Sequence, residues 1–147
     1  DEQSPIGTLL DTVDRMFRVE AEAKGLEFVV KPTTSHMSAP PLIVMRVLSN
    51  LVSNAIRHTA QGTVEIETQV SPDDVAILVC NSHPDPQSID FDVLFTAGNK
   101  GETSEGSGLG LAIAREQAAN IGLDLSLDVL ADSDTPVCFR LSEKTAP

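Results

Sequence analysis

The spacing of apolar residues along the chain predicts three helices. The first run begins at Ile6, repeats every three to four residues, and is followed by Gly25, a residue typical of helix ends. The second run ends near Thr59, and the third extends from Gly108 to about Asn120. Each run is long enough for several helical turns, so we expect helices over these three stretches.

Shorter runs rich in β-branched residues predict the strands. The expected strands span Leu26 to Val30, Thr63 to Val70, Val75 to Cys80, Leu123 to Leu130 and Val137 to Leu141. Residues 32–41 and 81–88 are rich in Pro and polar residues and predict loops, and the Gly, Ser and Glu-rich stretch 96–107 is expected to be mobile. The order of elements contains few parallel crossovers. It predicts a two-layer α/β sandwich, with a mixed, mostly antiparallel five-stranded sheet and three helices on one face.

Composition limits the class of protein. A chain of 147 residues with 41% hydrophobic content suits one domain over residues 1–147. Its formal net charge of -12 argues against nucleic acid or an anionic membrane surface as partner. No run reaches the roughly 18 to 20 apolar residues that cross a bilayer. Because the chain begins at Asp1 without a Met, we expect it to be part of a longer protein, whose other parts include any membrane anchor.

The two cysteines are expected to be reduced core thiols. Cys80 and Cys138 both lie in apolar, strand-like runs and lack CxxC spacing. This arrangement fits buried thiols of a cytosolic protein better than a disulfide framework.

The polar face of the second helix carries an unusual pair of residues. In the segment LSNLVSNAIRHT (48–59), Asn50 and Asn54 are four residues apart and share one helical face. The opposite face is an apolar stripe made of Val44, Leu48, Leu51, Val52, Ala55 and Ile56. Asn is a mediocre helix former, so a pair in mid-helix suggests a ligand. A solvated face with two tolerated Asn residues remains the alternative.

The third helix starts in a glycine-rich segment, GSGLGLAIARE (106–116). Three glycines at alternate positions let backbone amides and a helix N-terminus approach an anion. The segment is neither a Walker A loop, because no GK[ST] follows, nor a Rossmann fingerprint, because no strand precedes it and the third glycine is missing. Taken alone, it is also consistent with a hinge or a tight packing corner.

Together these segments resemble the catalytic, ATP-binding domain of sensor histidine kinases, within the superfamily of gyrase, mismatch-repair and heat-shock chaperone ATPases. RVLSNLVSNAIRHT resembles the N box of that family, and GSGLGLAIARE its second glycine box. Residues 91–95 and the following stretch 96–107 resemble the F box and the ATP lid. Residues 1–25 are similar to the helix that connects this domain to a dimerising hairpin. The resemblance implies a Bergerat-type sandwich with ATP between the N-box helix and the lid.

The resemblance also implies an ATP site. Its residues would be Asn50, Asn54, Arg57, His58, Asn81, Lys100, Gly106, Gly108, Leu109 and Gly110. Asn54 would be the single protein ligand of Mg²⁺, which keeps phosphate and water as its other ligands. Arg57 and His58 would offset phosphate charge, Lys100 would reach the γ-phosphate, and backbone amides at the helix start would bind phosphate. An ordinary surface role remains the alternative for His58 and Lys100.

The residue at position 50 helps to distinguish a domain that transfers the phosphoryl group of ATP from one that hydrolyses ATP. ATPases of the superfamily that hydrolyse ATP tend to have a general base, Glu, at this position, and Asn cannot act as one. A histidine kinase needs no such base, because an imidazole is already a nucleophile. His36, His58 and His83 lack the acidic neighbour of the family's acceptor motif. The phosphorylated histidine is therefore expected on a separate dimerisation domain.

The chain departs from the family at the first glycine box, DxGxG. In VCNSHPDPQ, Asn81 replaces the Asp that accepts a hydrogen bond from adenine, and His83 and Asp85 replace the two glycines. Pro84 and Pro86 stiffen the turn. This departure keeps a second interpretation open: a degenerate domain with weak or no nucleotide binding that acts as a regulatory or docking module. An anti-sigma-type serine kinase is a third, which the N-terminal segment argues against.

The implied cofactors are ATP and Mg²⁺. The implied partners are the histidine-bearing dimerisation domain of the same protein and a response regulator, and no nucleic acid. We expect the full-length protein to be a homodimer, while the fragment itself can be monomeric. The fragment is expected to be cytoplasmic, and the parent protein to be a candidate for anchoring in the inner membrane.

Overall fold

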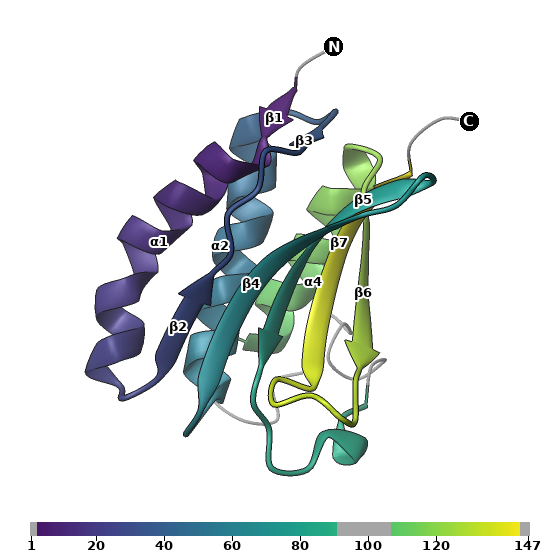
Figure 1. Cartoon of the computed structure of the whole chain (residues 1–147). Coiled ribbons are helices and arrows are strands. Elements are labelled where there is room, and N and C mark those ends of the chain that lie inside the picture. The colour runs from purple at the N-terminus through teal and green to yellow at the C-terminus, as the bar shows by residue number, and fades with distance from the viewer. Residues whose placement is uncertain (1–2, 91–106, 145–147) are drawn as a thin grey trace.

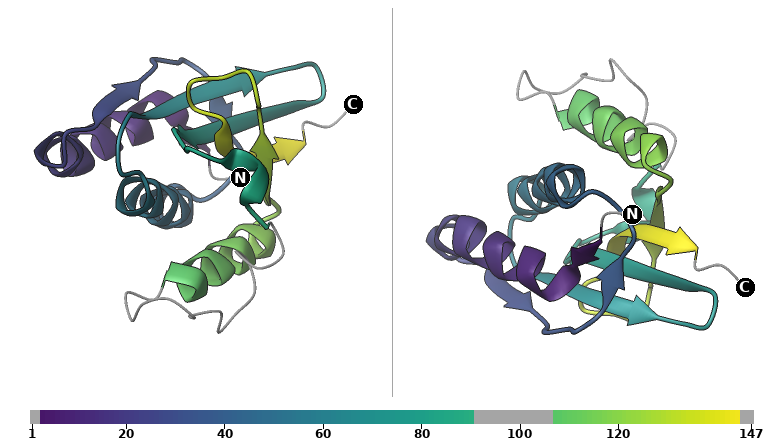
Figure 2. Two further views of the ribbon diagram at one scale, coloured as in Figure 1. Left: turned by 90° about the horizontal axis from the view of Figure 1, so that it is seen from below. Right: turned by 90° about the horizontal axis from the view of Figure 1, so that it is seen from above.

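The computed structural model describes residues 3–90 and 107–144, which form two layers (Figures 1 and 2). The helical layer contains α1 (Ile6–Ala23), α2 (Pro41–His58) and α4 (Ser107–Asn120). The sheet contains β2 (Glu27–Val30), β4 (Thr63–Val70), β5 (Asp74–Asn81), β6 (Asp124–Val129) and β7 (Val137–Lys144) in the order β2-β4-β5-β7-β6. Among the strand pairs of the described residues, the β2–β4 pair alone is parallel. The predicted two-layer sandwich with a mixed, mostly antiparallel sheet is confirmed.

The loop expected over residues 32–41 contains a short pairing that the sequence did not indicate. The two-residue strands β1 (Ser4–Pro5) and β3 (His36–Met37) pair antiparallel, and the buried Ser4 hydroxyl donates to the carbonyl of Ala39 at 2.6 Å. Two residues are too few to produce a period-2 pattern, so such a pairing is not visible in sequence. It fixes the start of α1 beside the start of α2.

The main core lies between the helices and one face of the sheet. Val75, Ile77 and Val79 alternate along β5 and belong to this core, together with the buried residues of α1 and α2. The predicted apolar stripe of α2 is buried throughout: Val44, Leu48, Leu51, Val52, Ala55 and Ile56. No helix in the described part combines the length and hydropathy that crossing a bilayer needs.

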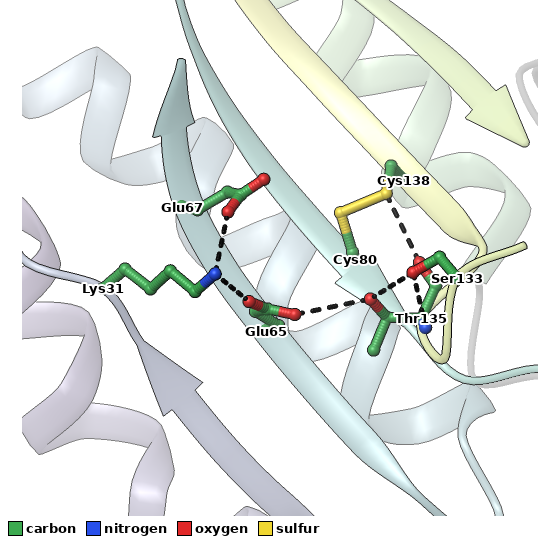
Figure 3. The surroundings of a disulfide bond; sticks show 7 residues. All are labelled: Lys31, Glu65, Glu67, Cys80, Ser133, Thr135 and Cys138. Atoms are coloured by element: carbon green, nitrogen blue, oxygen red, sulfur yellow. Dashed lines mark hydrogen bonds and ion pairs between the residues drawn. A yellow bond between two sulfur atoms is a disulfide. The ribbon is translucent and has the colours of Figure 1, made fainter. Parts of the chain in front are cut away.

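The opposite face of the sheet carries a second, smaller cluster of Ala76, Leu78, Cys80 and Cys138. Cys80 and Cys138 are direct register partners on β5 and β7 and are joined in a disulfide (Figure 3). The prediction of reduced thiols is therefore wrong. The reason is that the pairing depends on the register of two strands 58 residues apart, and a sequence pattern does not give long-range register.

Candidate functional site

Three predicted site segments meet at one end of the molecule (Figure 1). α2 contacts both β5 and α4. β5 ends at Asn81, which pairs with Val64 near the start of β4. Because β4 follows α2 through a short turn, the C-terminal ends of α2 and β5 lie at the same end of the sheet. α4 leads into β6 at the opposite end of the sheet, where Asp124 of β6 pairs with Ser142 near the end of β7. The N-terminus of α4 therefore lies at the end of the sheet where α2 and β5 end. The layout brings an amide-bearing helix, a strand end and a helix N-terminus together.

Asn54 is buried, although the helical wheel assigned it to the polar face. Only 8% of its surface is exposed, because α2 is covered by β5 on one side and α4 on another. Asn50, one turn earlier, is half-buried and lines a groove of about 420 Å³ together with Ile113 and Gln117 of α4. Asn54 therefore faces packed elements, whereas Asn50 borders an open groove.

The end of α2 is held by side chains that satisfy its last carbonyls. The Thr59 hydroxyl donates to Ala55 O at 2.6 Å, and the Lys24 ammonium donates to Ile56 O at 2.6 Å and to Arg57 O at 2.9 Å. Ile56 O also accepts from the Thr59 amide at 3.4 Å. The last carbonyls of a helix otherwise need partners from outside it, and a cation there also interacts favourably with the helix dipole. The cap fixes the turn that carries the exposed residues Arg57 and His58.

Asn81 occupies the last position of β5 and is 5% exposed. Strand alternation puts it on the same face as Val79, towards the helices. Its side-chain Nδ2 donates to Ser82 O at 2.8 Å. Because the NH₂ group is engaged in this way, the amide oxygen remains as an acceptor.

The loop that replaces the first glycine box is held by Ser82 and His83. Ser82 Oγ accepts from the Thr63 amide at 3.0 Å and donates to Asp134 O at 2.9 Å, and His83 Nδ1 accepts from the Asp85 amide at 2.9 Å. No described residue other than glycine has a positive φ. The backbone of this loop therefore adopts conformations that do not require glycine. Its contacts come from the start of β4 and from the β6–β7 turn.

The remaining predicted phosphate-binding residues lie at the start of α4. Gly108, Leu109 and Gly110 lie in the first turn of this helix, whose N-terminus suits an anion. Gly106 and Lys100, with the expected F box at 91–95 and most of the lid at 96–107, lie outside the described residues.

Comparison with known proteins identifies the family. Residues 39–145 match the family model described as histidine kinase-, DNA gyrase B-, and HSP90-like ATPase. This chain belongs to that ATPase family. It is 31% identical over 146 residues to the sensor histidine kinase GlrK of Escherichia coli, covering 95% of the chain and 30% of that protein. It is 32% identical over 114 residues to the sensor protein CutS of Streptomyces coelicolor, covering 73% of the chain and 28% of that protein.

Solved structures of the family share the fold. The catalytic domain of histidine kinase ThkA superposes with a TM-score of 0.79 at 23% identity, covering 99% of this chain and 98% of that domain. Full-length ShkA, solved in complex with AMPPNP, gives a TM-score of 0.72 at 22% identity, covering 99% of this chain and 32% of that one. The chain spans 30% of the length of GlrK and 28% of that of CutS, and corresponds in fold to the catalytic domain of a histidine kinase.

Two residues that hold the elements of the candidate site were missed from sequence. Lys24 caps α2 from the end of α1, and Ser82, which follows Asn81, bonds to the start of β4 and to the β6–β7 turn. Neither position stands out in the sequence, because a Lys after a helix and a Ser in a Pro-rich loop are what a solvated surface would also show. Both roles depend on which segments pack together.

The donor set fits Mg²⁺ held chiefly by nucleotide. Within residues 3–90 and 107–144, no group of three or more His, Cys, Asp or Glu side chains could hold a metal ion. An amide oxygen such as that of Asn54 is a hard ligand, and Mg²⁺ is typically bound through one or two protein oxygens plus phosphate and water. The residues present therefore fit one Mg²⁺ that accompanies a polyphosphate.

Proposed function

We propose that this chain binds Mg·ATP between α2, the end of β5 and the start of α4, and donates the γ-phosphoryl group to a histidine on another domain. The observation that supports the proposal is that α2, which carries Asn54, packs against β5, which ends at Asn81, and against α4, whose N-terminus lies at the same end of the sandwich (Figure 1). Each group suits a different part of the nucleotide: an amide oxygen for the metal, an acceptor for an exocyclic amine, and helix amides for phosphate.

The phosphate half of the site combines α2 and α4. Asn54 would hold Mg²⁺, which neutralises phosphate charge when it is bound. Arg57 and His58 extend from the capped last turn of α2, where a cation lowers the repulsion between phosphate groups. Lys100 and Gly106, with the amides of Gly108 to Gly110, complete the proposed phosphate contacts.

The adenine half depends on Asn81. Its oxygen is available to accept from an amino group because Nδ2 is engaged by Ser82 O. A neutral amide accepts more weakly than a carboxylate. We therefore expect adenine to be recognised through the same hydrogen bond as in relatives that have Asp, with lower affinity.

Asn50 favours transfer over hydrolysis. It lines the groove between α2 and α4 and offers no group that can remove a proton from water. A histidine acceptor is itself nucleophilic, so positioning and charge neutralisation are sufficient. The acceptor would be supplied by a dimerisation domain of the same protein, entered through α1, and the product would pass to a response regulator, as ThkA was solved in complex with the response regulator TrrA. The domain would work in the cytoplasm.

The test is a calorimetric titration of the chain with ATP, with and without Mg²⁺. We expect saturable binding that Mg²⁺ strengthens, and loss of that Mg²⁺ dependence in Asn54→Ala. The matched control is Asn120→Ala, which removes an exposed amide at the other end of α4. Thermal unfolding of both variants checks that they fold. Absence of binding at millimolar nucleotide would reject the proposal.

The loop at Ser82 to Pro86 supports one alternative, a docking or regulatory module without productive nucleotide binding. Its side chains border a hollow of about 610 Å³ together with the β6–β7 turn. Absence of saturable ATP binding in a folded wild type, with or without Mg²⁺, would favour this alternative.

A further inference from the structure

The Cys80–Cys138 disulfide lies one residue away from the proposed adenine contact. Cys80 directly precedes Asn81, and Cys138 directly follows Val137, the register partner of Asn81 on β7. We propose that this cystine is a reversible thiol pair that controls the placement of Asn81, so that its oxidation state regulates the site. The nucleotide part of this proposal rests on the proposed function.

The disulfide is separate from the main core. The helices cover the other face of the sheet (Figure 2), and the cystine belongs to the small cluster with Ala76 and Leu78. The β5–β7 pairing extends from the Asn81–Val137 pair to the Asp74–Lys144 pair at the other end of the two strands. Opening the bond would therefore leave the core and most of the ladder in place, and its effect would be local.

The turn between β6 and β7 lies beside the sulfur atoms (Figure 3). The carbonyl oxygen of Thr135 lies 3.5 Å from Cys138 Sγ, and the Thr135 amide donates to Ser133 Oγ at 3.0 Å. Cys80 is 5% exposed and Cys138 1%. Glu65, the β4 register partner of Cys80, lies beside this turn and is paired with Lys31 at 2.8 Å. A thiol reagent would reach Cys80 first, once the turn moves.

The same turn is bonded to the loop that follows Asn81. Ser82 Oγ donates to Asp134 O at 2.9 Å, and the Ser82 amide donates to Thr63 O at 3.0 Å. The disulfide is thus coupled to Asn81 in two ways, through the adjoining backbone of β5 and through the turn. Two sulfur atoms that are no longer bonded need more room. Reduction would therefore displace the Cys80–Cys138 pair of strand residues and weaken the hydrogen bonds of Ser82 to Asp134 and Thr63.

The setting of an ATP-dependent domain favours reversibility. Disulfides are rare in reducing compartments, and those that form there are usually transient or redox-sensing. A cystine in a domain that binds ATP would be exposed to cellular dithiols. Its reduction would be one step in normal operation, and not a loss of structure.

The exchange is balanced with a dithiol as the reductant. One thiolate attacks the Cys80 sulfur, the Cys80–Cys138 bond breaks, and Cys138 leaves as a thiolate that takes up a proton. The second thiol of the reductant then attacks the mixed disulfide and releases Cys80 as a thiol. The dithiol loses two electrons and two protons and becomes a cyclic disulfide, and the protein gains two thiols. A small disulfide runs the step in reverse.

The experiment equilibrates the chain in dithiothreitol buffers of graded redox ratio and divides each sample three ways. Thiol labelling with mass spectrometry gives the fraction reduced, hydrogen exchange gives the protection of the Ser82 amide, and calorimetry gives the Kd for Mg·ATP. We expect reversible reduction of the folded chain, faster exchange at Ser82, and a Kd about 3- to 10-fold higher, as for one weakened hydrogen bond. The control is Cys80→Ala/Cys138→Ala, whose exchange and Kd should not respond to dithiothreitol.

The outcomes separate this proposal from the proposed function. A disulfide that opens only when the chain is denatured would overturn the proposal, and so would reduction with unchanged exchange at Ser82. Redox-dependent exchange without nucleotide binding in either state would reject the proposed function while supporting control of Asn81 by the thiol pair. Redox-dependent exchange with an unchanged Kd would overturn regulation of nucleotide affinity.

Discussion

Removing the Lys24 cap tests whether the end of α2 is held from outside the helix. Lys24→Met keeps most of the aliphatic chain and removes the ammonium that donates to Ile56 O and Arg57 O at 2.6 and 2.9 Å. Hydrogen bonds from charged groups contribute about 1.5 to 3 kcal/mol each when well shielded, but Lys24 is exposed, so solvent reduces this contribution. A cation at a helix C-terminus adds about 0.3 to 1 kcal/mol. We expect Lys24→Met to lower the free energy of unfolding by about 1 to 2 kcal/mol.

The assay is urea unfolding followed by far-ultraviolet circular dichroism, because the chain has no Trp or Tyr for fluorescence. For a chain of this size the loss corresponds to a fall in Tm of roughly 3 to 6 °C. Lys24→Arg retains a cationic donor and should recover most of the stability. Lys144→Met is the control: it removes the same charge from the exposed end of β7, where Lys144 caps no helix and has a Coulombic interaction with Asp74. If Lys24→Met and Lys144→Met cost the same, the cap contributes nothing, and our explanation of the end of α2 is wrong.

Three further predictions concern single positions. Gly62→Ala should cost about 1 to 2 kcal/mol more than Gly122→Ala in urea unfolding, because both have positive φ but only Gly62 would press a Cβ against a serine side chain of the neighbouring loop. Thr68→Val should raise the unfolding free energy by about 1 kcal/mol, since the buried Thr68 hydroxyl has no partner among the described residues. The hydrogen bond from Arg140 holds the pKa of Asp74 below its usual 3.8, so the pair stabilises the fold above that pH and its contribution is lost as the pH falls through the lowered pKa. The stability difference between wild type and Asp74→Asn should therefore shrink in acid, and a constant difference would contradict this.

The fold was largely predictable from sequence because each element has a local signal. The apolar stripe of α2 repeats with the helical period and Pro41 is the first residue of that helix, while residues 75–80 of β5 are an unbroken apolar run. The two-residue pairing of Ser4–Pro5 with His36–Met37 has no such signal. Local periodicity predicts elements, but it does not predict contacts that two or three residues make across the chain.

The site was only partly predictable, for the same reason. Asn54 could be singled out because Asn is unusual within a helix, and its assignment to Mg²⁺ remains a prediction. Lys24 could not be singled out, because the carbonyls it caps belong to a helix more than thirty residues away. The pairing of Cys80 with Cys138 likewise depends on the register of β5 and β7. Residues whose role depends on tertiary neighbours look ordinary in sequence.

Asn81, which stands where the family has Asp, makes a hydrogen bond to the loop that follows it. Nδ2 of Asn81 donates to Ser82 O at 2.8 Å, which a carboxylate cannot do, and Asn81 is 5% exposed. Asn81→Asp would therefore strengthen the acceptor offered to adenine while setting a buried negative charge beside a carbonyl oxygen. We expect the variant to lose about 1 to 3 kcal/mol of stability, from the missing hydrogen bond and the cost of burying the charge.

Nucleotide should restore part of this stability in Asn81→Asp, because an amino group would then satisfy the carboxylate. The measurement is Tm with and without Mg·ATP, and Asn120→Asp, an exposed change of equal charge, is the control. A larger ATP-dependent rise in Tm for Asn81→Asp than for wild type would support adenine recognition at this position. An equal rise in both would mean that adenine is bound elsewhere, and that Asn81 serves only to hold the loop.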